Sequence, residues 1–180
     1  MIFFTADLHF NHENVIQHCN RPFISADEMD EALIRNWNTT VTHKDEVYIL
    51  GDFTMRPAAE AHGYLTRLKG RKYFIRGNHD RFLKGFTPFE NYFEWVKDYH
   101  ELRINGQCFV LFHYPILEWA NYYRGSYHCF GHVHNSQTSA KLLEGLKGPA
   151  FNVGVDVYDY RPVSIEKVME WAAQAKAANK

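Results

Sequence analysis

The sequence contains few cysteines and no long apolar segment. Its three cysteines, Cys19, Cys108 and Cys129, are an odd number without a Cys-x-x-Cys spacing. That pattern fits neither a disulfide framework nor a thiolate zinc site, so we expect a reducing, cytoplasmic location. No apolar run approaches about 18 residues, and the N-terminus lacks a basic segment, so we expect no membrane span, no signal peptide and no membrane partner.

An excess of charge of either sign is also missing. The formal net charge is −1 and the pI is about 6.8, so we expect no extensive binding of duplex nucleic acid. Hydrophobic residues make up 46% and charged residues 23% of the 180 residues, close to globular averages. This length suits a single domain over residues 1–180, and the sequence leaves its oligomeric state open.

Hydrophobic patterning predicts strands that alternate with helices in the first half and pair with one another in the second. The predicted strands are residues 2–6, 47–50, 73–75, 101–104, 108–112, 127–130 and 150–155. The predicted helices are 25–41, with a Ser25 and Glu28 capping box, 57–69 and 165–176. Asn105-Gly106 predicts a hairpin turn. The sequence therefore favours an α/β fold with a mixed sheet or two sheets.

Histidine is abundant, with 11 residues, and many of the histidines follow predicted strands. Ligands collect beyond the carboxyl ends of strands in α/β folds, and neutral imidazole is a common metal ligand. Asp-x-His and His-x-His pairs in extended backbone place both side chains on the same side. The strand ends carry seven oxygen or nitrogen donors: Asp7, His9, Asp52, Asn78, His113, His132 and His134.

Seven such donors exceed the needs of one tetrahedral ion. They predict two divalent transition-metal ions, Mn, Fe, Ni or Zn, sharing a carboxylate. Each motif alone is more simply explained as a turn, a helix cap or a buried histidine. Five such motifs in succession, each after an apolar run, are hard to explain by packing.

In this order, Asp7-x-His9, Gly51-Asp52, Gly77-Asn78-His79-Asp80, His113 and Gly131-His132-x-His134 resemble the calcineurin-like metallophosphoesterases, of the compact bacterial or phage type. The resemblance implies two face-to-face mixed β-sheets flanked by helices in a four-layer fold. It implies that Asp7, His9 and His134 hold a first metal. It also implies that Asn78, His113 and His132 hold a second metal, that Asp52 bridges the two, and that His79 is catalytic.

One position departs from many relatives of the protein phosphatase type. Those relatives have an aspartate three residues after the bridging one to orient the catalytic histidine, and here Met55 occupies that place. His79 then depends on another group, such as Asp80, or acts as a plain phosphate donor.

Substrate clues are weaker, and each also has a structural explanation. His12 is a candidate phosphate-binding residue, as is Asn11. The segment with Trp119, Tyr122, Tyr123 and Arg124 either stacks on a nucleobase or covers the core. Further phosphate-binding candidates are Arg21, Arg56, Arg76 and Arg81, each more simply a solvated surface residue.

These features predict hydrolysis of a small phosphate ester by metal-activated hydroxide, with Mn favoured. Phosphodiesters of nucleotide, cyclic-nucleotide or nucleic-acid-end type are preferred because aromatic residues near the site suit nucleosides. A broad-range phosphomonoesterase is the first alternative, and a non-catalytic scaffold with the same fold is the second. The complete ligand set argues against the scaffold, and the charge balance argues against a nucleic-acid binder without catalysis.

Overall fold

Two mixed β-sheets form the centre of the molecule in the computed structural model, which describes residues 1–85, 91–136, 141, 143–146 and 148–178. The five-stranded sheet has the order β4-β3-β2-β1-β9. Its strands are β1 (Ile2–Thr5), β2 (Glu46–Leu50), β3 (Arg71–Ile75), β4 (Trp95–Lys97) and β9 (Val163–Ser164). The four-stranded sheet contains, in this order, β5 (Tyr99–Ile104), β6 (Gln107–Phe112), β7 (Tyr127–Phe130) and β8 (Ala150–Asn152).

Most neighbouring strands run parallel, which matters for the position of the site. Strands β1 to β4 are parallel and β9 is antiparallel to β1. In the other sheet β6, β7 and β8 are parallel and β5 pairs with β6 in antiparallel fashion. The carboxyl ends of parallel strands meet at one edge of each sheet, so the loops that follow them lie together.

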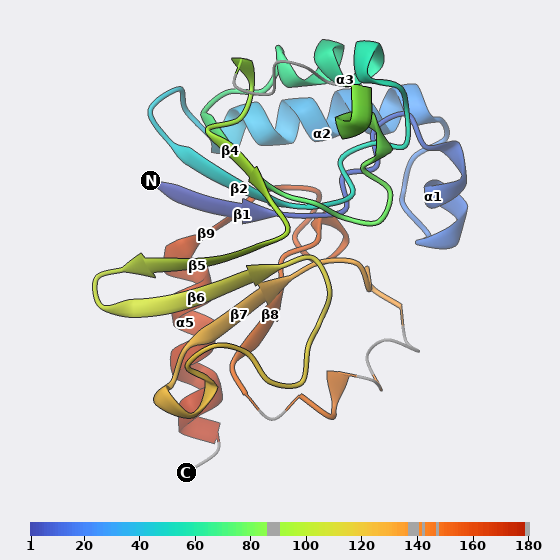
Figure 1. Cartoon of the computed structure of the whole chain (residues 1–180). Helices are drawn as coiled ribbons and strands as arrows, with labels where there is room; N and C mark the ends of the chain where they lie inside the picture. The colour runs from blue at the N-terminus through green and yellow to red at the C-terminus, as the bar shows by residue number, and fades with distance from the viewer. Residues whose placement is uncertain (86–90, 137–140, 142, 147, 179–180) are drawn as a thin grey trace.

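The five-stranded sheet is buried on both faces, and its sequence alternation shows why. Val47 and Ile49 of β2 pack with helices α2 (Ala26–Thr40) and α3 (Ala58–Leu65), whereas Tyr48 and Leu50 pack toward the four-stranded sheet. Figure 1 shows α2 and α3 on one side of this sheet, with the second sheet on its other side. The predicted pair of mixed sheets flanked by helices is confirmed.

The remaining helical elements lie at the periphery. They are α1 (Glu13–His18), α5 (Ile165–Ala178) and the 3-10 turns η1 (Arg81–Gly85), η3 (Tyr122–Arg124) and η4 (Val155–Val157). Val168 and Ala172 of α5 join the core between the sheets. The outer face of the four-stranded sheet is covered by Trp119, which packs with Val110.

Helix boundaries follow local hydrogen bonds. The Ser25 side chain accepts the Glu28 backbone N–H at 3.2 Å, which confirms the predicted start of α2. Helix α3 ends at Leu65, earlier than the predicted residue 69. The chain leaves the helix there, and the Lys69 carbonyl accepts the Trp37 indole N–H at 2.9 Å.

The predicted hairpin turn is confirmed, because Asn105 and Gly106 have φ values of 50° and 82° between β5 and β6. Strand β8 ends at Asn152, earlier than predicted residue 155. The sequence interpretation missed α1, β4 and β9. They contain six, three and two residues, too few for a periodic pattern to be visible.

The three cysteines are buried and form no disulfide. Among the described residues, no helix is both long enough and apolar enough to cross a membrane.

Candidate metal centre

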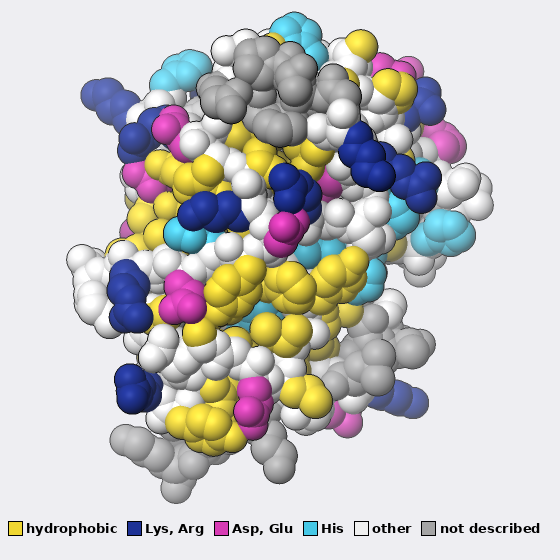
Figure 2. Space-filling view, viewed as in Figure 1, with side chains coloured by type: hydrophobic (Ala, Val, Ile, Leu, Met, Phe, Trp, Pro, Cys, Tyr) yellow, Lys and Arg dark blue, Asp and Glu magenta, His cyan; other side chains and the backbone are white. Residues whose placement is uncertain are grey.

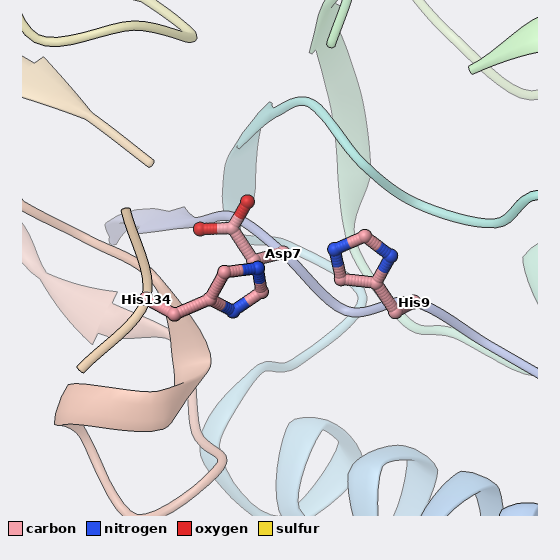
Figure 3. Close-up of side chains that lie close together, drawn as sticks. All are labelled: Asp7, His9 and His134. Carbon is pink, nitrogen blue, oxygen red and sulfur yellow. The ribbon is translucent and has the colours of Figure 1, made fainter. Parts of the chain in front are cut away.

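Loops from both sheets bring a first group of metal-binding side chains together. Asp7 and His9 follow β1, and His134 follows β7. Their candidate donor atoms lie within 4.8 Å of one another. Figure 3 shows His134 approaching Asp7 and His9 from a separate segment, with one ring nitrogen toward Asp7 and the other pointing away. These are the three residues predicted for a first metal.

A second group lies beside the first. Donor atoms of Asp52, His113 and His132 are also within 4.8 Å of one another. The Asn78 Oδ1 atom is 3.0 Å from His113 Nε2, which places the fourth predicted residue at this group. The fold therefore brings all seven predicted ligands to one place.

Asp52 connects the two groups. Its Oδ2 atom lies 3.6 Å from His9 Nε2 in the first group and 3.5 Å from His113 Nε2 in the second. A carboxylate in this position can contribute to two neighbouring cation sites.

The backbone of these loops is not extended, contrary to the reasoning from the sequence. Asp7, His9, Asp52, His132 and His134 all have positive φ, between 49° and 72°. The Asp-x-His and His-x-His pairs do bring their side chains together, but they do so through left-handed turns and not through the alternation of a strand. Residues other than glycine rarely adopt this conformation, and it concentrates at functional sites.

Two glycines permit the close packing of the loops. A Cβ atom on Gly77 would lie 2.3 Å from Asp52 Oδ1, and one on Gly131 would lie 2.8 Å from Asp7 Oδ2. The absence of a side chain at these positions lets the backbone approach both carboxylates.

Further contacts orient the imidazole rings. The Nδ1 atom of His113 is 2.7 Å from the Leu50 carbonyl oxygen, and that of His134 is 2.7 Å from Asp156 Oδ2. Each contact makes Nδ1 the donor and leaves Nε2 for a metal. Both ring nitrogens of His9 are buried with no hydrogen-bond partner among the described residues, as expected of a ligand.

The acidic groups of the centre differ in their electrostatics. Burial raises the pKa of Asp52, but its interactions with His113 and the charge of His9 lower the pKa to about 2. Burial raises the pKa of Asp7 to about 6 despite the charges of His134 and His113. Two buried carboxylates surrounded by imidazoles form a donor set of the type that divalent transition metals bind, so the residues fit the predicted ions.

His79 lies beside this centre, with its ring centroid 5.5 Å from that of His9. Its backbone N–H donates to Asp52 Oδ1 at 2.9 Å. Asp80 does not orient its ring. The Asp80 carboxylate instead accepts the backbone N–H groups of Asp52, Phe53 and Gly77, and it joins the loops after β2 and β3.

A cavity of about 590 Å³ opens beside the metal centre. Its lining includes His9, His12, His79, Tyr114 and His132. The Nδ1 atom of His12 is buried and has no hydrogen-bond partner among the described residues. Histidine side chains are visible on the right of Figure 2, at the level where the loops of the two sheets meet.

Several weaker substrate candidates have structural roles. Asn11 donates from its backbone to Asp30 and from its side chain to Glu60. Trp119 is 7% exposed and packs against His128, so it covers the core and does not line the cavity. Of the arginines, Arg56 and Arg76 form exposed ion pairs.

The sequence interpretation missed one functional candidate, Asp156, and misjudged the position of another, Arg21. Arg21 was expected to be a surface residue, but the side chains of both are fully buried and form an ion pair. Their only sequence signal is an acidic residue between Val155 and Val157, since an acid in an apolar segment needs a buried partner.

The fold and the site together define a class: α/β proteins with two face-to-face sheets and a histidine- and aspartate-rich metal centre at the carboxyl ends of the strands. A family model described as calcineurin-like phosphoesterase matches residues 1–108. Uncharacterized protein MJ1445 of Methanocaldococcus jannaschii is 36% identical over 177 residues, 97% of this chain and 93% of that protein. The chain belongs to the calcineurin-like phosphoesterase family.

Two further comparisons found similar proteins. The Gene 66 protein of Mycobacterium phage D29 is 39% identical over 83 residues, 44% of this chain and 40% of the phage protein. The structure of a protein of unknown function, AQ665 from Aquifex aeolicus, superposes with a TM-score of 0.76. It is 24% identical and covers 95% of this chain and 98% of its own, so it supports the fold. Members of this family depend on divalent metals. Membership therefore supports the assignment of this chain as a hydrolase of phosphoesters.

Proposed function

We propose that the protein hydrolyses phosphodiesters with two divalent transition-metal ions, of which Mn is favoured. The observation that carries this proposal is the pair of donor groups joined by Asp52 Oδ2. Asp7, His9 and His134 would hold one ion and Asn78, His113 and His132 the other. When bound, such ions supply positive charge to the phosphate and lower the pKa of water at the site.

The protein's own side chains would bind and orient the ester. His79 lies at the edge of the centre and its ring can donate a proton or a hydrogen bond to a phosphate oxygen. His12 lines the same cavity with its ring centroid 5.3 Å from that of His9, within reach of a second oxygen. Together they would hold the phosphate against the metal ligands.

The size and lining of the cavity favour a diester over a monoester. A volume of about 590 Å³ leaves room for a group on each side of the phosphorus atom. Tyr114 lies on this lining with its ring 4.7 Å from that of His132, and its face can stack on a nucleobase. A small nucleotide or cyclic nucleotide is therefore the favoured substrate class.

Two alternatives make different predictions. A broad-range phosphomonoesterase would use the same centre without filling both sides of the cavity. A non-catalytic scaffold would have no use for buried imidazole nitrogens without partners, such as those of His9.

The test compares the Mn-loaded protein on bis-p-nitrophenyl phosphate and p-nitrophenyl phosphate, followed by a panel of cyclic nucleotides. We expect a higher kcat/KM for the diester. Cleavage of the monoester alone would transfer the assignment to a phosphomonoesterase, and no cleavage of either by a protein that binds Mn would favour the scaffold.

A further inference from the structure

A fully buried ion pair lies behind the first group of metal ligands. The Nε and Nη2 atoms of Arg21 donate to the two carboxylate oxygens of Asp156 at 2.8 and 2.9 Å. Both side chains are 0% exposed. Arg21 follows α1 and Asp156 lies in η4, so the pair joins segments 135 residues apart in the sequence. Removing two charges from water is costly, and the cost is offset only where the geometry of the pair is good and further hydrogen bonds satisfy both groups.

Arg21 also contacts the backbone of the first motif. Its Nη2 atom donates to the Asp7 carbonyl oxygen at 2.7 Å, and its Nη1 atom donates to the Leu8 carbonyl oxygen at 3.0 Å. Asp7 and His9 both have left-handed backbone here, with φ of 58° and 53°. The planar guanidinium thus stabilises a strained turn that carries two of the three ligands.

Asp156 contacts the third ligand. Its Oδ2 atom accepts the Nδ1–H of His134 at 2.7 Å, so one carboxylate binds both Arg21 and His134. This contact fixes the orientation of the ring and its tautomer, with Nε2 directed toward the first group. The corresponding contact in the second group is with the Leu50 carbonyl, without a charged partner.

We infer that Arg21 and Asp156 are positioning residues that set the affinity of the first metal site independently of the second. The inference rests on the proposed metal centre and extends it. Contacts that orient a metal-bound histidine typically change affinity by 10–100-fold when removed. The two ions would then differ in how firmly they are held, with the first depending on this buried pair.

A separate cation site at Asp156 fits the structure less well. Cys19, His134 and Asp156 offer donor atoms within 4.8 Å of one another. Both Asp156 oxygens, however, already accept hydrogen bonds from the Arg21 guanidinium, whose positive charge opposes a cation at the same carboxylate.

The test measures Mn²⁺ binding to the full chain by titration calorimetry in two backgrounds. His113→Ala leaves the first group intact, and His9→Ala leaves the second. We expect Asp156→Asn to weaken Mn²⁺ binding 10–100-fold in the His113→Ala background and less than threefold in the His9→Ala background. Arg21→Lys, which keeps the charge and removes the planar fork, should show the same selectivity.

The matched control is Asp45→Asn. The Asp45 carboxylate is nearly buried and accepts hydrogen bonds from the N-terminal amine and Thr42. It lies just before β2, at the end of that strand that is distant from Asp52. The substitution should leave both affinities unchanged. Equal losses in the two backgrounds, or none in either, would overturn the inference while leaving the metal centre intact. If the unsubstituted protein binds no Mn²⁺, the proposed function fails and the inference fails with it.

A spectroscopic measurement separates positioning from a loss of folding. In the Zn²⁺-loaded protein labelled with ¹⁵N-histidine, the His134 Nδ1–H should be protected from exchange. Asp156→Asn should shorten the lifetime of this proton and leave that of the His113 Nδ1–H unchanged. An unchanged His134 signal would contradict the assigned role.

Discussion

Single residues of the centre owe their positions to contacts that a strand pattern cannot reveal. His113 is oriented by a backbone carbonyl and His134 by Asp156, whereas Asp7 accepts the His132 backbone N–H through both of its oxygens. The first and last motifs are therefore joined directly, although they lie 125 residues apart. These three ligands therefore depend on groups from other segments of the chain.

His79 provides the first test at this scale. Its ring lies beside the ligands but is not among the donor groups, so His79→Ala should leave Mn binding unchanged and lower kcat by about 10²–10⁴-fold. Mn stoichiometry and steady-state kinetics measure the two effects. His43→Ala, which removes an exposed histidine before β2, is the control. Unchanged turnover in His79→Ala would contradict the catalytic role proposed for it.

Asp52 provides the second test at the scale of single residues. Asp52→Asn keeps the size of the side chain but removes the negative charge that both groups share, so affinity for both ions should fall by about tenfold or more. Metal analysis after gel filtration measures the occupancy. Asp98→Asn makes the same change in an exposed ion pair with Arg76 and should have no effect. One ion retained at full occupancy would rule out a shared carboxylate.

At the scale of elements, strand β3 contains a lysine in an unusual environment. Lys72 is 8% exposed, and its ammonium group donates to the Gly70 carbonyl at 3.0 Å. Burial lowers the pKa of Lys72 from 10.5 to about 8. The folded state therefore binds fewer protons than the unfolded state between these values, and stability should rise with pH across that window.

Lys72→Met should remove this rise and raise the free energy of unfolding at pH 7 by up to about 3 kcal/mol. Urea denaturation at pH 7, 8, 9 and 10 measures both effects as a difference from the unsubstituted protein. Lys44→Met, an exposed lysine, is the control. The same pH dependence of the free energy of unfolding in the unsubstituted protein and in Lys72→Met would show that burying the charged Lys72 ammonium group does not destabilise the fold.

At the scale of the whole molecule, the centre joins the two sheets. Ligands come from loops of both sheets, so cation binding should stabilise the whole structure. At 100 times its Kd, one bound ion adds about 2.7 kcal/mol. Saturating Mn should thus raise Tm by about 5–10 °C per site, and chelator should reverse the increase. Differential scanning calorimetry with and without Mn measures the shift, and an unchanged Tm would contradict binding to the folded state.

The sequence by itself determined the strands that carry the motifs, the Ser25 cap, the Asn105-Gly106 turn and the set of candidate ligands. These signals are local, because apolar runs, capping residues and turn residues act over a few neighbours. The short strand β4 and the end of α3 could not be predicted, since three residues show no period and the segment after the helix bonds to Trp37, which is distant in the sequence.

Only the tertiary structure decided how the ligands meet. It showed left-handed turns where extended backbone was expected, placed Trp119 in the core, used Asp80 to join two loops, and buried Arg21 with Asp156. Burial and pairing across more than a hundred residues depend on how the two sheets pack, and no local pattern of residues contains that information.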